Sequence, residues 1–282
     1  LANFLNDRLN IRRGDRVACL ALNRAAVIKL FFALSRLGAI LVPLNFRLAA
    51  AEFIYYLEDA TPKAIFFDKV HQDRVRDFKS KGILNDYICF DDDESVGLAL
   101  PRIWPTLQPV PPPEEALGPD DPQLIIYTSG TSGDPKAVIL THGMITWNAI
   151  NTNLGWDLRS DDKTILHAAM FYTAGWNVFT LPLFQCRGVN ILIQSFDPDL
   201  ILDLIAREGV TVFFGVPTMF QMLIESAKFA STDFSTVRFM VSGGAPLSLD
   251  ILETFKTQKS IRIWEGYGLT EVGPNNFMAN GK

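Results

Sequence analysis

Residues 124–142 read Leu-Ile-Ile-Tyr-Thr-Ser-Gly-Thr-Ser-Gly-Asp-Pro-Lys-Ala-Val-Ile-Leu-Thr-His, and they join an apolar run to a loop of hydroxyls and glycines that ends in a lysine. The run 124–127 is typical of a short buried strand. Glycines allow backbone N–H groups to turn towards an anion, and hydroxyls and an ammonium group add further donors. The stretch therefore predicts a phosphate-binding loop, with the candidate ligands Thr128, Ser129, Gly130, Thr131, Ser132, Gly133 and Lys136.

The spacing of this loop excludes the Walker A class, in which a glycine is followed after four residues by Gly-Lys-Ser or Gly-Lys-Thr. Here Lys136 lies three residues beyond Gly133 and is followed by Ala137. A flexible Ser/Gly linker is the plainer alternative, but linkers are rarely wedged between two strand-like runs such as 124–127 and 137–140. Phosphate binding is therefore the favoured interpretation.

Composition bounds the fold and argues against several partners. A chain of 282 residues that is 48% hydrophobic can bury a sizeable core, as one large domain or as two lobes. The net charge of -5 and the shortness of basic clusters such as Arg12-Arg13 argue against a nucleic-acid partner. No apolar run reaches the roughly 18 residues that span a bilayer, so a cytoplasmic protein is expected.

The cysteines and histidines do not predict a metal centre or a disulfide framework. The cysteines are odd in number and far apart, and the histidines lack the spacing of metal ligands. His142 falls in the first turn of a predicted helix, where a structural role is favoured over catalysis. The residues concerned are Cys19, Cys89, Cys186, His71, His142 and His167.

Strand-like and helical segments alternate along the chain, which predicts an α/β fold of parallel sheets layered with helices. Several strands are apolar throughout, as expected when helices cover both faces of a sheet. Strands are predicted at 17–22, 39–43, 63–67, 87–90, 124–127, 137–140, 164–169, 189–193, 210–215, 238–242 and 261–264. Helices are predicted at 1–9, 25–37, 50–57, 72–79, 142–154, 176–184, 199–208, 218–227 and 249–257.

Ligands of α/β sheets bind beyond the carboxyl ends of the strands, and one such end carries Gly266-Tyr267-Gly268-Leu269-Thr270-Glu271. An aromatic ring can stack on adenine, a threonine can donate to an α-phosphate, and Glu271 can hold Mg²⁺, which prefers oxygen ligands. Taken alone, a Gly-Tyr-Gly segment is more often only a turn.

Together the two motifs resemble those of one family. Residues 127–136 resemble the signature of the adenylate-forming superfamily, which comprises acyl-CoA synthetases, aryl-CoA ligases, adenylation domains of peptide synthetases and beetle luciferases. Residues 266–271 match the family's Gly-Tyr-Gly-x-Thr-Glu segment and follow in the family's order. The resemblance covers essentially the whole chain, and it implies ATP, Mg²⁺ and coenzyme A as cofactors.

A third segment, at the end of a predicted strand, is similar to the loop that lies beside adenine in this family. Its glycine backbone leaves room for a flat base. The residues are Gly243, Gly244, Ala245 and Pro246.

The chain departs from the family at Tyr172. Acyl- and aryl-CoA ligases usually carry His there, and amino-acid-activating members carry Asp. A phenol keeps a donor for a carboxylate but offers no negative charge to an amine, so amino-acid activation is disfavoured. Trp176, Gly215 and Val216 are further candidates to line the acyl site, although Tyr172 and the Phe-rich strand before Gly215 are also compatible with simple core packing.

The resemblance implies activation of a fatty acid or related carboxylic acid to an acyl-adenylate, followed by transfer to coenzyme A. Lys136, Thr131 and Thr270 would stabilise the charge on the α-phosphate, and Glu271 with Thr131 would hold the metal. A non-catalytic nucleotide-binding module, an aryl-acid ligase and a luciferase-like oxygenase are the alternatives. A homodimer and a peripheral contact with a membrane are left open.

The ends of the sequence suggest a fragment of the family's N-terminal domain. The expected division is a first lobe at about 24–160 and a second at about 161–282 together with 1–23. The small C-terminal domain, with its catalytic lysine, and a ribose-binding aspartate are expected to lie outside residues 1–282.

Overall fold

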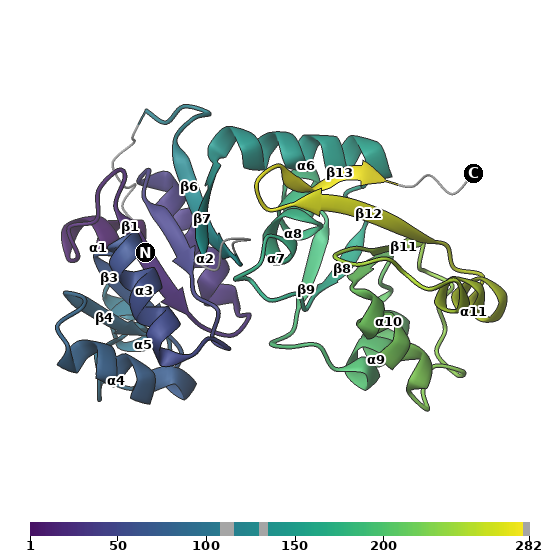
Figure 1. Cartoon of the computed structure of the whole chain (residues 1–282), viewed down its shortest axis with the longest axis horizontal. Coiled ribbons are helices and arrows are strands. Elements are labelled where there is room, and N and C mark those ends of the chain that lie inside the picture. Colours follow the sequence, from purple (N-terminus) through teal and green to yellow (C-terminus); the bar gives the residue numbers. More distant parts are fainter. Residues whose placement is uncertain (108–115, 130–134, 279–282) are drawn as a thin grey trace. The chain divides into compact units, whose positions relative to one another are not determined.

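The computed structural model describes residues 1–107, 116–129 and 135–278. The chain divides into two compact units, unit 1 (Leu1–Gly143) and unit 2 (Met144–Lys282). Each unit is built on its own sheet system, with the elements labelled in Figure 1.

Among the described residues, unit 1 contains a seven-stranded sheet in the order β5-β4-β3-β1-β2-β6-β7. Neighbouring strands are parallel except β6 and β7, which pair antiparallel. The strands are β1 (Arg16–Leu20), β2 (Ile40–Pro43), β3 (Ala64–Phe67), β4 (Asp86–Cys89), β5 (Leu98–Ala99), β6 (Pro122–Thr128) and β7 (Lys136–Thr141).

Helices of unit 1 cover this sheet because its central strands are apolar on both faces. The alternate residues Ala18, Leu20, Ile65 and Phe67 pack with α3 and α4 in one buried cluster, while the intervening Val17 and Phe66 are equally buried on the other face. The helices are α1 (Ala2–Asp7), α2 (Ala25–Arg36), α3 (Ala50–Ala60), α4 (Gln72–Ser80) and α5 (Leu100–Ile103), with the short 3₁₀ segments η1 (Lys69–His71) and η2 (Trp104–Thr106).

The described part of unit 2, residues 144–278, has a four-stranded sheet in the order β10-β11-β12-β13, and the parallel pair β8-β9 lies beside it. The Thr211 N–H, just before β10, donates to the Lys163 carbonyl of β8 at 2.9 Å. The strands are β8 (Lys163–Leu166), β9 (Val189–Leu192), β10 (Val212–Gly215), β11 (Phe239–Ser242), β12 (Ile263–Leu269) and β13 (Gly273–Met278). The β12–β13 pair is antiparallel, and the other pairs among these strands are parallel.

The helices of unit 2 enclose an aromatic core. Phe220 meets Phe213 and Phe255 edge to face, with ring centroids 6.0 and 5.6 Å apart. The longer helices are well delimited: Asp197 caps α9 by accepting from the Leu200 N–H, and Gly209 ends that helix in a left-handed conformation. The helices are α6 (His142–Trp156), α7 (Ala174–Asn177), α8 (Thr180–Cys186), α9 (Pro198–Glu208), α10 (Pro217–Glu225) and α11 (Leu249–Lys259).

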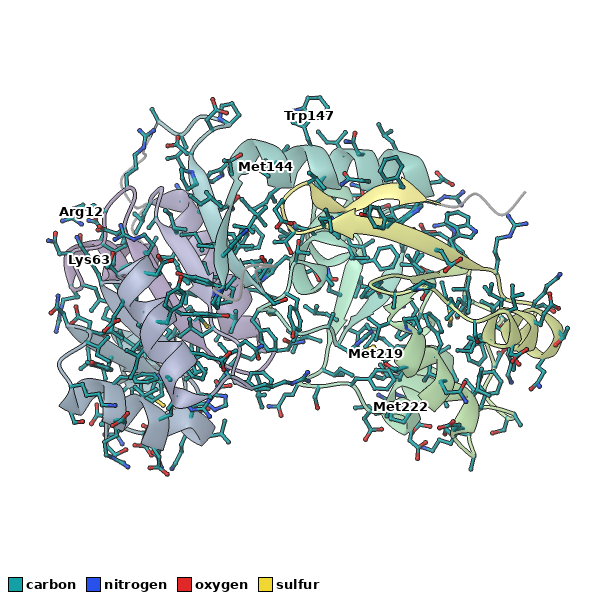
Figure 2. All side chains as sticks on the ribbon, in the orientation of Figure 1. Arg12, Lys63, Met144, Trp147, Met219 and Met222 are labelled. Atoms are coloured by element: carbon teal, nitrogen blue, oxygen red, sulfur yellow. The ribbon has the colours of Figure 1, made fainter. Side chains whose placement is uncertain are left out.

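Helix α6 packs against β13 on one side and exposes apolar side chains on another. Asn275 of β13 donates to the Thr152 hydroxyl at 2.9 Å, and β13 runs alongside α6 (Figure 1). Trp147 points away from the rest of unit 2 (Figure 2), and Met144 and Leu154 are also exposed. Even so, no described helix combines the length and the apolar character needed to cross a membrane.

The predicted α/β class with largely parallel sheets is confirmed, but several elements differ from those expected. The strand predicted at 261–264 continues to Leu269 as β12, and the partner β13 was not predicted. The helix predicted at 176–184 is two short helices, α7 and α8.

The division of the chain also differs from the expected lobes. Residues 1–23 belong to unit 1 rather than to the second lobe, because β1 pairs with β2 and β3 at the centre of the seven-stranded sheet. The boundary lies between Gly143 and Met144, within the first turn of α6, instead of near residue 160.

Candidate functional site

The predicted phosphate loop belongs to unit 1, and its two stems are described. Residues 130–134, which include the candidates Gly130, Thr131, Ser132 and Gly133, lie outside the described residues. Strand β6 ends at Thr128 and β7 begins at Lys136, and these two residues are paired in register. The Lys136 side chain is exposed and forms no ion pair with a described residue, so its ammonium group is available to an anion.

The other predicted nucleotide segments line one pocket of about 700 Å³ in unit 2. This volume lies within the usual range for small-molecule sites. The pocket is formed by the loop after β11, by β12 and by β13. Its lining residues are Gly244, Ala245, Pro246, Glu265, Gly266, Tyr267, Gly268, Leu269 and Phe277.

One wall of this pocket is an exposed apolar surface. Tyr267 and Leu269 are two residues apart on β12 and therefore share a face of the strand. Phe277 is the cross-strand partner of Tyr267, with ring centroids 6.1 Å apart. Tyr267 is 60% exposed, so its ring is accessible from solvent; its stacking on a flat base stays a prediction.

Two glycines of the site are required by the backbone. Gly244 has a φ of +85°, a conformation that L side chains rarely adopt. A Cβ at Gly268 would lie 2.3 Å from the Pro274 carbonyl carbon, at the point where β12 and β13 shift register. The backbone of the site therefore needs glycine at both positions, independently of any contact with a ligand.

Glu265 is a site residue that the sequence did not reveal. Its Oε1 accepts from the Leu247 N–H at 2.9 Å, which ties β12 to the loop 243–246. Leu269 and Phe277 were also not predicted. The alternation of Tyr267 and Leu269 is the signal that could have found the apolar wall, but nothing in the sequence links Glu265 to Leu247.

Thr270 and Glu271, the predicted phosphate and metal ligands, lie in the turn between β12 and β13. Glu271 is exposed and makes no hydrogen bond or ion pair with the residues described, so its carboxylate fits a hard cation that prefers oxygen. Within the described ranges no cluster of three or more Asp, Glu, His or Cys could hold a metal by itself. The second predicted metal ligand, Thr131, is outside those ranges.

Gly215 and Val216, predicted for the acyl side, lie against the predicted adenine loop. The Gly243 N–H donates to the Gly215 carbonyl at 3.3 Å. A Cβ built on Gly244 would lie 3.6 Å from Val216 Cγ1. Two segments 28 residues apart in the sequence therefore meet at the carboxyl ends of the adjacent strands β10 and β11.

Tyr172 and Trp176 have different surroundings. Tyr172 is 47% exposed, lies 4.5 Å from the Phe171 ring, and its hydroxyl has no hydrogen-bond partner in the described part of the chain. Trp176 is fully buried, and its indole N–H donates to the Met170 carbonyl at 2.5 Å. Tyr172 is thus accessible to a ligand, while Trp176 fixes the backbone of this segment.

His167, just beyond β8, is a buried titratable group that sequence reasoning set aside. Its Nε2 lies 2.7 Å from the Phe214 carbonyl, and its ring stacks on Phe213. Burial lowers the pKa of His167 to about 4, so the imidazole is neutral at pH 7 and Nε2 donates to the carbonyl. The bond joins the ends of β8 and β10.

Known proteins match both the sequence and the fold. The chain is 34% identical to a feruloyl-CoA synthase from Amycolatopsis sp over 277 residues, which is 97% of this chain and 52% of that protein. It is 30% identical to the long-chain-fatty-acid–CoA ligase FadD13 from Mycobacterium tuberculosis over 93% of this chain and 51% of that protein. The ATP-bound crystal structure of MatB from Rhodopseudomonas palustris is similar with a TM-score of 0.85 and 29% identity, covering 98% of this chain and 55% of that one.

The chain thus spans about half the length of the curated relatives it matches. A model of one family, described as AMP-binding enzyme, matches residues 1–281. Because this match covers nearly every residue, including the phosphate loop and the pocket of unit 2, the chain belongs to the AMP-binding enzyme family.

Proposed function

We propose that this protein activates a carboxylic acid with ATP, releasing pyrophosphate, and transfers the acyl group from the adenylate to coenzyme A. It would then be an AMP-forming acid–thiol ligase. The observation that carries the proposal is the pocket of unit 2, in which the predicted adenine loop and the Tyr267 wall line one cavity. The names of the relatives, which are CoA synthases and ligases, agree with it.

The chemistry explains why phosphate-binding residues are needed. A carboxylate oxygen attacks the α-phosphorus of ATP, and pyrophosphate leaves with the electrons of the broken P–O bond. The coenzyme A thiol, after losing its proton, then attacks the acyl carbon, and AMP leaves. Lys136, Thr131 and Thr270 would stabilise the negative charge that builds on the α-phosphate in the first step.

Mg²⁺, when bound, would neutralise charge on the phosphates, and Glu271 is the described residue best suited to hold it. Its carboxylate is exposed and has no partner within the described part of the chain. Thr131 is the second proposed ligand.

We further propose a fatty acid as the substrate, with an aryl acid as the alternative. The two relatives named above carry ferulate and long-chain fatty acids in their names, so the names favour neither class of acid. Tyr172 supports a simple carboxylic acid over an amino acid, because its accessible hydroxyl can donate to a carboxylate but gives an ammonium group no counter-charge. Gly215 and Val216 would line the acyl side, beside the loop 243–246.

Isotope exchange between pyrophosphate and ATP, with the full-length natural protein and a panel of fatty, aryl and amino acids, tests this function. We expect exchange only with the fatty or aryl acids, and a loss of about 10²-fold or more in Lys136→Ala and in Glu271→Ala. Lys81→Ala and Glu253→Ala, which remove exposed charges just after α4 and on α11, are the matched controls and should exchange normally. ATP binding without exchange for any acid would instead indicate a non-catalytic nucleotide-binding module.

A further inference from the structure

Helix α3 contacts both stems of the phosphate loop. On the β6 side, the Tyr127 hydroxyl donates to Asp59 Oδ2 at 2.6 Å. On the β7 side, the Tyr55 hydroxyl donates to the Pro135 carbonyl at 3.3 Å. Tyr55 and Asp59 are four residues apart, so they lie on the same face of the helix, one turn from each other.

The contact at Tyr127 is a strong one. The ring is 8% exposed and stacks on Tyr56 with centroids 4.0 Å apart and planes 14° from parallel. Burial and the neighbouring Asp59 carboxylate raise the pKa of Tyr127, so the phenol keeps its proton and donates it. A short hydrogen bond from a neutral donor to a carboxylate is about twice as strong as one between neutral groups.

Helix α3 is itself fixed at both ends. At its C-terminus, Arg16 of β1 donates to the Ala60 carbonyl at 2.7 Å and to the Thr61 hydroxyl at 2.5 Å. At its N-terminus, Glu52 accepts from the Ala49 N–H at 2.8 Å. Phe53 and Leu57 bury the helix in the core of unit 1. The stems are therefore attached to a rigid element and not to another loop.

We infer that Asp59 and Tyr55 are positioning residues for ATP, which hold the donors at the two stems of the phosphate loop; this inference rests on the proposed function. Asp59 acts through Tyr127, whose next residue is Thr128. Tyr55 acts through Pro135, whose next residue is Lys136. Each α3 contact is thus one residue away from a predicted phosphate ligand.

This arrangement matters because anion binding by fixed donors depends on their geometry. A donor stabilises phosphate fully only when it is held within about 0.5 Å of the productive position. Thr128 and Lys136 are paired across β6 and β7, but β7 is an edge strand and its first residues are exposed. The sheet alone therefore supports only one side of Lys136, and the contact of Tyr55 with Pro135 supports the chain just before it.

Three single-residue variants of the full-length protein test the inference: Tyr127→Phe, Asp59→Ala and Tyr55→Phe. The readouts are the ATP KM and kcat in pyrophosphate exchange, the ATP Kd by calorimetry and the thermal midpoint. For Tyr127→Phe we expect the ATP KM and Kd to rise about tenfold, as for loss of one charge-assisted hydrogen bond, and the thermal midpoint to fall by only a few degrees because the folded protein loses the same bond. Asp59→Asn, which keeps an acceptor, should recover part of the loss.

Coupling between the two residues gives a second, independent readout. Because Asp59 acts through the Tyr127 hydroxyl, Tyr127→Phe combined with Asp59→Ala should weaken ATP binding no more than the larger single change. Asp77→Ala removes an exposed carboxylate of α4 that pairs with Lys81, four residues further along, and it should leave KM and Kd unchanged.

The outcomes separate this inference from the proposed function. If wild type catalyses exchange and Tyr127→Phe and Tyr55→Phe both keep wild-type KM and Kd, the positioning role is overturned while the function stands. A fall in thermal midpoint with unchanged Kd likewise overturns it, because the bond would then be only structural. If wild type binds ATP without exchange and Tyr127→Phe binds it about tenfold more weakly, the positioning role stands and the proposed activity fails.

Discussion

Gly266 and Gly268 are two residues apart on β12, yet a methyl group would meet very different surroundings at the two positions. At Gly268 it would lie 2.3 Å from the Pro274 carbonyl carbon and 2.4 Å from the Gly273 carbonyl oxygen. At Gly266 the nearest atom, Val241 Cγ1, is 3.5 Å away, an ordinary contact. We expect Gly268→Ala to lower the free energy of unfolding by about 1–3 kcal/mol, because backbone atoms must move.

Gly266→Ala is the matched control and should change stability by less than about 0.5 kcal/mol. Denaturant melts of both variants, followed by tryptophan fluorescence, measure the difference. Equal stability of the two variants would show that the register shift between β12 and β13 has room for a side chain at Gly268.

At the residue scale, a functional side chain could be predicted from the sequence when its role shows in the residues immediately around it. Tyr267 and Lys136 were predicted because a ring between glycines and a lysine after a hydroxyl-rich loop carry their chemistry on their own. Glu265 and Asp59 were not, because each acts on a group distant in the sequence, the Leu247 N–H and the Tyr127 hydroxyl. A carboxylate in a strand or on an exposed helix face gives no sign of such a partner.

At the element scale, a buried carboxylate joins three strands of unit 2 at their N-terminal ends. Asp162, just before β8, is 1% exposed. It accepts from the Thr211 hydroxyl at 2.6 Å, from Arg238 Nη1 at 2.5 Å and from the Arg159 N–H at 2.8 Å. Thr211 precedes β10 and Arg238 precedes β11, so one side chain links the starts of β8, β10 and β11.

We expect Asp162→Ala to destabilise the protein by about 3–5 kcal/mol, because it leaves Arg238 without its buried partner. The ATP KM of the folded fraction should not change, since Asp162 is at the opposite ends of the strands from the pocket. Asp161→Ala, at the exposed neighbouring position, should cost less than about 0.5 kcal/mol. Urea denaturation compares the two, and similar midpoints would contradict a linking role for Asp162.

Elements were predictable from sequence where apolar periodicity and end signals agreed, as in α9 with its Asp197 cap and Gly209 stop. Strand β13 was not predictable, because Gly273-Pro274-Asn275-Asn276 has the composition of a turn. It forms a strand because it pairs with β12 at the edge of the sheet, where Pro274 is tolerated, and because Asn275 bonds to α6.

At the scale of the whole molecule, the alternation of strands and helices predicted the parallel α/β class, because few other architectures can bury the apolar faces of alternating strands and helices. The division into units was not predictable from it. Strand β1 could have joined either sheet system, and only its pairing with β2 and β3 places the first residues in unit 1.

One property of the whole molecule follows from its histidines, all three of which have a pKa lowered first by burial: His71, His142 and His167. A base whose pKa is lower in the folded state binds fewer protons there than in the unfolded chain. The contribution of such a histidine to the free energy of unfolding is therefore complete at a pH above its unfolded pKa of 6.5. This contribution is lost as the pH falls towards the pKa in the folded state, which is about 4 for His167. Carboxylates with lowered pKa values, such as Asp121 and Asp233, also cost the protein stability as the pH falls, but they do so below about pH 3.8, their pKa in the unfolded chain.

We therefore expect the free energy of unfolding to decrease between pH 7.5 and pH 5, with His167 alone contributing about 2 kcal/mol of the decrease. Four of the five tryptophans lie in unit 2, which also contains His167, so tryptophan fluorescence in urea follows the relevant unit. His167→Gln keeps a donor for the Phe214 carbonyl but does not titrate. The free energy of unfolding of this variant should therefore fall by about 2 kcal/mol less than that of wild type over the same pH range. If wild type and His167→Gln lost the same stability over this range, the imidazole would not be the neutral, buried group that joins β8 to β10.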